Sequence, residues 1–389
     1  MAKKKLGVAL IGTKFMGKTH SNAFRQVSAF FDLPYDLEMK VLVGRNPKET
    51  AETAKKYGWQ EASTDWKAVL KRDDIHIVDI STPGDLHAPM AIAAAKAGKH
   101  IICEKPLANT RKEAESMLAA VKGAGIHHMC GFSYRFAPAV ASMKKMIQSG
   151  ELGEIFHFRA AYQQDWIVDP EFPLNWRLQK KTAGSGALGD IGAHIIDMCH
   201  NLVGQVSEVC AATETFIKKR PIADSSATIA AKTGHKKSAK MGTVDVDDAA
   251  IFLGRIKGAN TLATFEATRF APGRRNYNAI EVYGSKGSVT WNQEDMNVFN
   301  FYSMSDKGTE QGFRRIHATD PGHPYTSAWW PSAHIIGYEH LFTHEVYDFI
   351  TELGKKKVSY PTFEDGLNCQ KVLDAVEKSA KSKKWEKVG

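Results

Sequence analysis

The first 150 residues alternate short apolar segments with longer helical patterns, and this alternation constrains the fold more than any other feature. Leu6–Ile11 is a short apolar run, and a helical pattern follows Gly17 to about Val27. Strands that alternate with helices predict a parallel, doubly wound sheet with right-handed crossovers. The other predicted strands of this region are 39–43, 75–80, 99–103 and 127–132, and the other predicted helices are 48–57, 85–97, 110–123 and 138–148.

After Gly150 the pattern changes to strands that follow one another with few helices between them. Such a succession predicts a large, open and mostly antiparallel sheet. The predicted strands are 155–162, 206–215, 249–256, 261–269, 279–283 and 287–292. Residues 220–246 read as a long loop and 323–338 as an irregular segment, and helices over 339–353 and 364–380 close the chain.

A chain of 389 residues exceeds the size at which one hydrophobic core stops growing, so two domains are expected. We predict a Rossmann dinucleotide-binding domain at 1–132 and a substrate-binding domain at 133–389. The C-terminal helices could pack back on the first of these domains.

Composition excludes several classes of function. The formal net charge of +9 comes from scattered lysines without a basic stripe or DNA-binding motif, so no nucleic-acid partner is predicted. No apolar run approaches the ~20 residues that span a bilayer, and Leu6–Ile11 is too short for a signal peptide. Five cysteines without Cys-x-x-Cys spacing predict neither a disulfide framework nor a metal site, and fit a reducing cytoplasm.

Two glycines mark the first predicted turn as a dinucleotide site. Gly12 and Gly17 match the first and third glycines of the Rossmann fingerprint, while Lys14 occupies the middle position. The middle glycine normally lets the backbone approach the pyrophosphate, so Lys14 either points away or contributes a charge contact. The cofactor-binding residues predicted at this turn are Gly12, Lys14, Phe15, Met16 and Gly17.

The end of the second predicted strand bears on the choice of cofactor. Enzymes that use NAD usually carry an acidic residue there for the ribose 2′-hydroxyl, but this chain has Arg45 after Val43 and Gly44. Arg45 could stack on adenine or bind a 2′-phosphate, which mildly favours NADP. NAD and NADP both remain open.

Two further turns lie where ligands bind in a parallel sheet, beyond the carboxyl ends of strands. Strand 99–103 runs into Glu104, Lys105 and Pro106, and the proline restricts Lys105 to extended geometry, which aims the amine. Strand 75–80 ends in a turn of Ser81, Thr82 and Pro83. His87 follows this turn and could border the nicotinamide, or could equally be a capping or exposed histidine. The added cofactor-binding candidates are Ser81, Thr82, Pro83, His87, Glu104 and Lys105.

A second constellation lies in the other predicted domain. A helix is predicted to start near Asp190, and positions i and i+4 on a helix share a face, so Asp190 and His194 would project together. Oxidation of a secondary alcohol requires removal of the hydroxyl proton, which suits histidine, and an ammonium would stabilise the developing alkoxide. A capping aspartate beside a packed histidine is the alternative for these residues alone.

Taken together, the glycine turn, Glu104-Lys105-Pro106 and the Asp190…His194 pair resemble the glucose–fructose oxidoreductase/inositol dehydrogenase/MocA family over nearly the whole chain. The resemblance implies that Lys105 is the catalytic lysine, Asp190 the substrate-binding aspartate and His194 the catalytic histidine. It also implies a homo-oligomer, a dimer or tetramer formed through the C-terminal sheet.

Within that family the chain looks most like levoglucosan dehydrogenases and glycoside 3-dehydrogenases. The stretches that carry this likeness are 15–20, 132–135, 162–166, 175–177 and 183–186. It implies substrate-binding roles for Tyr134, Gln164, Trp166 and Arg177, beside Asp190 and His194, although Trp166 could equally be a core residue. The general use of NAD by such relatives opposes the preference that Arg45 suggests.

The function implied is hydride transfer between a nicotinamide cofactor and a secondary ring alcohol of a sugar, anhydrosugar, glycoside or inositol, with a levoglucosan-type 3-dehydrogenase favoured. One alternative within the family is a redox-neutral, NAD-dependent glycosidase. Another is a non-catalytic regulator that senses NAD(P), although such a protein would need none of Lys105, Asp190 and His194.

Overall fold

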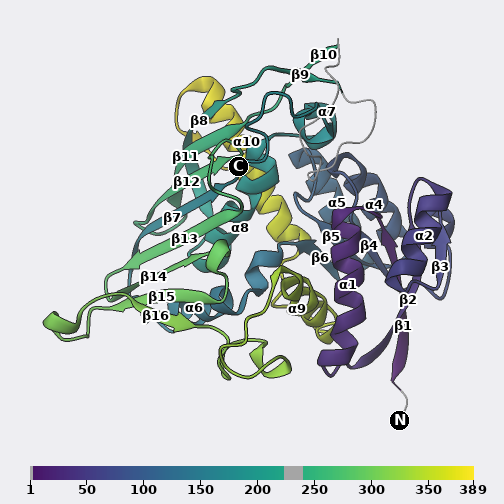
Figure 1. Cartoon of the computed structure of the whole chain (residues 1–389), viewed down its shortest axis with the longest axis horizontal. Helices are drawn as coiled ribbons and strands as arrows, with labels where there is room; N and C mark the ends of the chain where they lie inside the picture. The colour runs from purple at the N-terminus through teal and green to yellow at the C-terminus, as the bar shows by residue number, and fades with distance from the viewer. Residues whose placement is uncertain (1–2, 223–239) are drawn as a thin grey trace. The chain divides into compact units, whose positions relative to one another are not determined.

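A computed structural model describes residues 3–222 and 240–389 of the chain (Figure 1). Contacts divide the chain into two compact units. The first unit comprises Met1–Ala137 and Thr319–Leu367, and the second comprises Pro138–Ala318 and Asn368–Gly389. The predicted domain boundary between residues 132 and 133 stays a prediction.

Within the described residues, the first unit contains a six-stranded parallel sheet in the order β3-β2-β1-β4-β5-β6, which confirms the Rossmann prediction. The order reverses between β1 and β4, where ligands bind in open α/β sheets. The strand β3 and the helix α3 were not predicted, because both are very short. The elements are β1 (Lys4–Ile11), α1 (Phe15–Phe30), β2 (Tyr35–Val43), α2 (Pro47–Tyr57), β3 (Glu61–Ser63), α3 (Trp66–Leu70), β4 (Ile77–Ile80), α4 (His87–Lys96), β5 (His100–Glu104), α5 (Arg111–Ala124) and β6 (His128–Gly131).

Central strands of this sheet are buried on both faces, as parallel strands are when helices cover them. Val8, Ala9 and Leu10 of β1 are completely buried, and so are Ile101 and Ile102 of β5. Near the other end of the chain, the helix α9 (Tyr338–Thr351) lies beside α1, as Figure 1 also shows. Burial of these strands fixes the turns at their carboxyl ends.

The second unit is built on a mixed sheet, which within the described residues has nine strands in the order β16-β15-β14-β13-β7-β12-β11-β8-β17. Only the β7–β12 pair in this sheet is parallel among the described residues, so the prediction of a mostly antiparallel sheet is confirmed. The strands are β7 (Ile155–Gln163), β8 (Val206–Glu214), β11 (Ala249–Ile256), β12 (Leu262–Thr268), β13 (Tyr277–Gly284), β14 (Gly287–Asn292), β15 (Val298–Ser303), β16 (Arg314–His317) and β17 (Glu386–Lys387).

The loop predicted over 220–246 is only partly right. Its ends form a short antiparallel pair of strands, β9 (Lys219–Pro221) and β10 (Met241–Thr243), while residues 223–239 lie outside the described residues. The strands β15, β16 and β17 were also missed by the prediction. The helices of this unit are α6 (Pro138–Gln148), α7 (Lys180–Ala183), α8 (Ala193–Leu202) and most of α10 (Phe363–Ser382).

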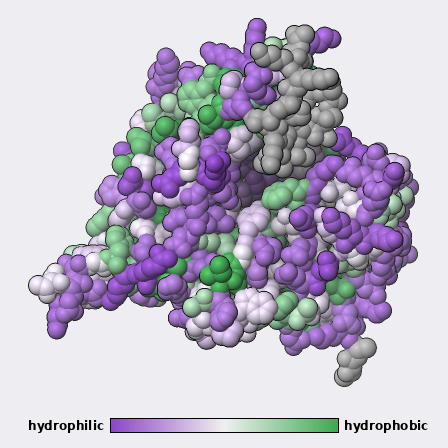
Figure 2. Space-filling model, viewed as in Figure 1, coloured by the Kyte–Doolittle hydropathy of each residue, from purple (hydrophilic) through white to green (hydrophobic). Residues whose placement is uncertain are grey.

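One face of the large sheet carries a hydrophobic core and the other is open. Phe252 pairs with Phe265 across β11 and β12, and their rings stack at 4.5 Å. On the opposite face Ile251 and Leu253 are 58% and 41% exposed. Figure 2 shows hydrophobic residues among hydrophilic ones over the region where Figure 1 places β8 and β11.

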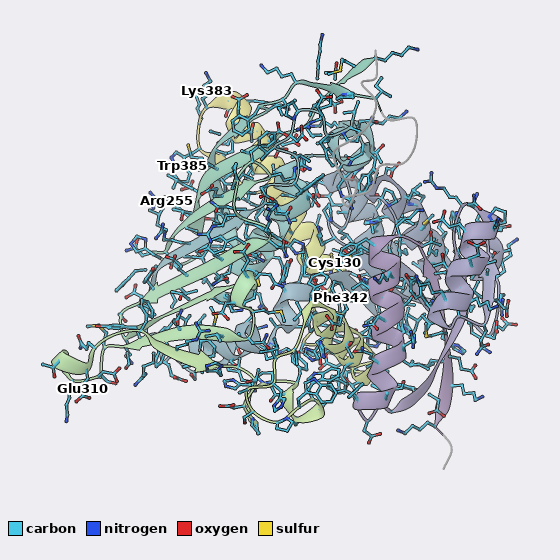
Figure 3. The ribbon with its side chains drawn as sticks, in the orientation of Figure 1. Cys130, Arg255, Glu310, Phe342, Lys383 and Trp385 are labelled. Carbon is cyan, nitrogen blue, oxygen red and sulfur yellow. The ribbon has the colours of Figure 1, made fainter. Side chains whose placement is uncertain are left out.

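The last residues of the chain form one edge of this sheet, where β17 pairs with β8. Arg255 of β11 lies over the ring of Trp385 at 5.6 Å, and Figure 3 shows the two side chains next to each other. Across the described part of the chain, no helix has both the length and the apolar character needed to cross a membrane.

Candidate active site

The turn after β1 has the geometry of a dinucleotide cradle. Gly12 has a φ of +136°, and a Cβ there would meet the backbone oxygen of Ser81. A Cβ at Gly17 would collide with the backbone oxygen of Gly12, so both positions require glycine. The first turn of α1, all of whose residues are described, holds no acidic side chain, which leaves this helix N-terminus suited to a pyrophosphate.

Lys14, which replaces the middle glycine, extends toward the next helix. Its Nζ forms an ion pair with Glu49 of α2, and a charge contact with the pyrophosphate stays a prediction. Arg45 is exposed just after β2. Phe15 is 54% exposed and its ring stacks on that of Tyr338 at 6.2 Å.

His87 joins the two turns predicted at the cofactor. Its side chain is buried, with Nδ1 3.0 Å from the oxygen of Pro106 and Nε2 2.9 Å from the oxygen of Thr82. The exposed alternative for this histidine is therefore wrong. Ser81 donates through Oγ to Asp79 Oδ1 at 2.9 Å, so the first of these turns is also held from within the sheet.

Lys105 is half-buried at the end of β5, and its backbone N–H donates to Glu104 Oε2 at 3.2 Å. The other oxygen of this carboxylate lies 2.9 Å from His20, a residue of α1 to which the sequence analysis assigned no role. Glu104 thus holds the backbone of the lysine that follows it.

In the second unit, Asp190 lies inside a π-helical turn (Leu188–Gly192) that leads into α8. Asp247 takes the place of a capping residue, since its carboxylate accepts the backbone N–H groups of Gly186 and Leu188, both at 2.7 Å. The capping alternative for Asp190 is therefore wrong. Burial raises the pKa of Asp247, and the amides of Leu188 and Gly186 with the charge of Arg269 oppose this rise.

Two cations lie near Asp190, one completely buried and one half-buried. Arg269 is completely buried, and its Nη1 is 3.7 Å from Asp190 Oδ2. Arg177 stacks on the ring of Trp176 at 4.2 Å. Burial lowers the pKa of Arg177, while the charge of Asp190 raises it and that of Arg269 lowers it further. The three charges therefore act on one another.

His194 is buried on α8, with its ring 5.8 Å from that of Tyr162. Tyr162 donates to Asn276 Oδ1 at 2.7 Å, and Gln164 donates to the same oxygen at 2.9 Å. Trp166 in turn donates to Gln164 Oε1 at 2.9 Å. The second unit thus brings polar groups from β7 and from the segment that follows it together with an asparagine that sequence reasoning missed.

Trp166 lies at the margin of a small hydrophobic core, and its substrate-binding role stays a prediction. Its ring packs edge-on against Phe172 at 5.2 Å beside a small hydrophobic core, and it stays partly exposed. Tyr134 belongs to the first unit, where it is buried in a 3-10 turn (Ser133–Phe136), with its ring 6.4 Å from that of Tyr338.

Models of two protein domains match the chain. Residues 6–132 match the oxidoreductase family with an NAD-binding Rossmann fold. Residues 140–290 match the GFO/IDH/MocA C-terminal domain.

Known proteins match the chain over nearly its full length. It is 43% identical to levoglucosan dehydrogenase of Pseudarthrobacter phenanthrenivorans, over 98% of this chain and 97% of that protein. An oxidoreductase domain protein from Kribbella flavida has 49% identity and a TM-score of 0.94, covering 99% of this chain and 100% of its own. A levoglucosan dehydrogenase in complex with NADH and levoglucosan has 42% identity and a TM-score of 0.92, again covering 99% and 100%.

Proposed function

Since this chain belongs to the GFO/IDH/MocA family of oxidoreductases, we propose that it oxidises a secondary ring alcohol of an anhydrosugar such as levoglucosan. The observation that carries this proposal is the 43% identity, over 98% of the chain, to a levoglucosan dehydrogenase. Related glycosides and inositols belong to the same chemical class, because each offers a secondary ring hydroxyl.

The residues of the first unit fit a nicotinamide dinucleotide. Gly12 and Gly17 leave room that a Cβ would fill, at the N-terminus of α1 where an anion is favoured. The cofactor, when bound, accepts the hydride that leaves the alcohol carbon. We propose that the turns at 81–83 and 104–106, with His87 between them, hold its nicotinamide end.

Three residues carry the proposed chemistry. The alcohol loses a hydride from carbon and a proton from oxygen, and His194 is the base that takes the proton. The ammonium of Lys105 stabilises the negative charge that develops on that oxygen. Asp190 accepts a hydrogen bond from a neighbouring sugar hydroxyl, and Arg269 supports its carboxylate from 3.7 Å.

The sugar contacts proposed are Tyr134, Gln164, Trp166 and Arg177. An indole offers a flat apolar surface to a pyranose ring, and amide and guanidinium groups match its hydroxyls. The partial exposure of Trp166 and Gln164 supports these roles, since each retains surface for a ligand.

The test is a panel of levoglucosan, inositols and simple glycosides assayed with NAD and with NADP. We expect levoglucosan to give steady formation of reduced cofactor. Bond cleavage of a glycoside without net reduction of the cofactor would instead identify a redox-neutral glycosidase. Cofactor binding without turnover of any polyol would favour a sensor of NAD(P).

We further propose that copies of the chain associate through the open face of the large sheet. Ile251 and Leu253 of β11 are the apolar residues on that face that support this proposal, being 58% and 41% exposed. Light scattering should show a dimer or tetramer, and Ile251→Lys should lower the mass. A cytoplasmic location is also proposed, because the five cysteines, all within the described ranges, form no disulfide.

A further inference from the structure

A histidine that the proposed chemistry does not use lies at the centre of the first unit. His20 of α1 is buried, with 1% of its surface exposed, and its two ring nitrogens face two carboxylates. Nδ1 is 2.6 Å from Asp79 Oδ2, and Nε2 is 2.9 Å from Glu104 Oε1. Asp79 is on β4 and Glu104 is the last residue of the adjacent strand β5.

This geometry suits a cationic ring. A neutral imidazole has one N–H, whereas an imidazolium has two and can donate to two ionised carboxylates at once. Burial alone would lower the pKa of His20, but the charges and hydrogen bonds of Asp79 and Glu104 outweigh it and raise the pKa well above its ordinary value. Removing the ring would leave two buried carboxylates without this partner.

Each carboxylate uses its second oxygen to hold one of the cofactor turns. Asp79 Oδ1 accepts the hydroxyl of Ser81 at 2.9 Å, and Glu104 Oε2 accepts the backbone N–H of Lys105 at 3.2 Å. The contacts therefore run without interruption from Ser81 through Asp79, His20 and Glu104 to the backbone of Lys105.

The surroundings leave little freedom for Glu104. A Cβ at Gly131 would lie 3.0 Å from Glu104 Oε1, which is tighter than an ordinary van der Waals contact, so a larger residue there would crowd this carboxylate. The ring of Phe342, labelled in Figure 3, lies 5.4 Å from that of His20. Burial, followed by the charges of neighbours that include Glu104, also raises the pKa of the Tyr338 phenol.

We propose that His20 is a positioning residue for Lys105. The imidazolium fixes the Glu104 carboxylate, and that carboxylate fixes the backbone from which the Lys105 amine extends toward the reacting oxygen. The inference rests on the proposed function only for the role of the amine. The contacts of His20 with Asp79 and Glu104 are observed in the first unit and do not depend on that function.

A double-mutant cycle between His20→Gln and Lys105→Ala tests the proposal. In single-turnover experiments, His20→Gln should slow hydride transfer at least about tenfold when Lys105 is present. In the Lys105→Ala background the same substitution should change the rate less than about threefold, because its effect passes through the lysine. Equal losses in both backgrounds would overturn the positioning role.

A matched control distinguishes positioning from general loosening. His344 is another fully buried histidine of the first unit, held by the oxygen of Phe136 at 2.9 Å and by the indole N–H of Trp329 at 2.6 Å. His344→Gln should lower the melting temperature while leaving the rate per folded molecule nearly unchanged. If His20→Gln does not fold, Glu104→Gln interrupts the same chain of contacts and replaces it in the cycle.

Two measurements need no substrate and so separate this inference from the proposed function. Nitrogen-15 spectra of the ring should show both nitrogens of His20 protonated at pH 8, and a neutral ring there would contradict the proposal. The rate of reductive methylation of Lys105, read by peptide mass spectrometry, should change at least about threefold in His20→Gln. An unchanged rate would also contradict it, whereas absence of sugar turnover by the unmodified protein would count against the proposed function alone.

Discussion

Arg269 approaches Asp190 from a completely buried position, with its Nη1 3.7 Å from Asp190 Oδ2. Its Nη2 donates to the backbone oxygen of Asp247 at 3.1 Å, which fixes the guanidinium against the same residue that caps the helical turn. Nε and Nη1 have no hydrogen-bond partner within the described ranges, so the interaction with Asp190 is one of charge. Arg269 therefore holds the aspartate proposed to bind sugar.

Arg269→Met should weaken sugar binding more than it slows chemistry. Loss of one close charge interaction is worth roughly 1.5 kcal/mol, at the low end for such pairs, so we expect the KM for the sugar to rise about tenfold with a smaller change in kcat. Steady-state kinetics at saturating cofactor measure this. Arg220→Met is the matched control, because Arg220 is equally buried but donates to the backbone oxygens of Ile167, Asp169 and Phe172. A tenfold rise in KM for Arg220→Met as well would show that the effect is general.

Lys105→Ala should slow hydride transfer severely while leaving cofactor binding nearly intact. The amine is proposed to contact the reacting oxygen, so its loss should raise the free energy of the transition state. We expect kcat to drop at least about 100-fold, the usual scale for acid–base groups, and the Kd for NADH to change little. Fluorescence titration with NADH and steady-state turnover measure the two quantities. A kcat within about threefold of the unmodified protein would remove Lys105 from the reaction.

Local sequence signals predicted the turns but not what supports them. Gly12, Gly17 and Pro106 act on their own backbone, so their roles can be read from adjacent residues. By contrast, Asp247 is 61 residues from Gly186, and Asn276 is 112 residues from Gln164. No periodicity links such pairs, and only the packed sheet brings them together.

The same reason explains why the sequence did not reveal the role of His20. It lies within the predicted first helix, but its partners are 59 and 84 residues further along the chain, at Asp79 and Glu104. An aspartate within an otherwise apolar strand was the one available signal, because a buried carboxylate requires a partner. Arg269 offered a similar signal, as a cation at the end of a predicted strand.

His194→Ala should lower kcat and remove the limb of the pH–rate profile near neutrality. Histidine titrates in that range, and the proposal makes it the base. Asp190→Ala should chiefly raise KM, with some loss of kcat from poorer alignment of the sugar. The profiles are measured where hydride transfer limits the rate. Persistence of the neutral limb in His194→Ala would mean that the proton leaves by another route, with Lys105 as the obvious candidate.

Arg45→Ala should reveal which cofactor the exposed arginine serves. If Arg45 pairs with a 2′-phosphate, the substitution should weaken NADP much more than NAD, because a charge-assisted contact is lost only with NADP. Calorimetric Kd values for both cofactors measure the difference. Equal weakening of both would show that Arg45 stacks on adenine, and no weakening of either would remove it from the site.

Histidines at the amino ends of the parallel strands should make the first unit sensitive to acid. His128 accepts the backbone N–H of Phe363 through Nδ1 at 3.1 Å, and His100 accepts that of His127 at 3.1 Å. A ring nitrogen can accept only when it carries no proton. Burial lowers the pKa of His128 and of His100 to about 4, and that of His344 to about 3.

The sign of the pH dependence follows from these shifts. Between about pH 6.5 and pH 4 these histidines bind protons in the unfolded chain but remain neutral in the folded protein. The free energy of unfolding therefore falls as the pH falls. Each buried histidine steepens the slope by up to about 1.4 kcal/mol per pH unit. His20 does not contribute in this window, because its raised pKa keeps it protonated there and its stabilisation is lost only at higher pH.

We therefore expect the urea midpoint to fall steadily from pH 6.5 to pH 4.5 in the unmodified protein. His128→Asn keeps an acceptor for the Phe363 N–H but cannot titrate, so its midpoint should fall less steeply over the same range. An exposed histidine, such as His334, supplies the control, because His334→Asn should leave the slope as it is. Identical slopes for His128→Asn and the unmodified protein would show that His128 is protonated equally in the folded and unfolded states, contrary to its burial.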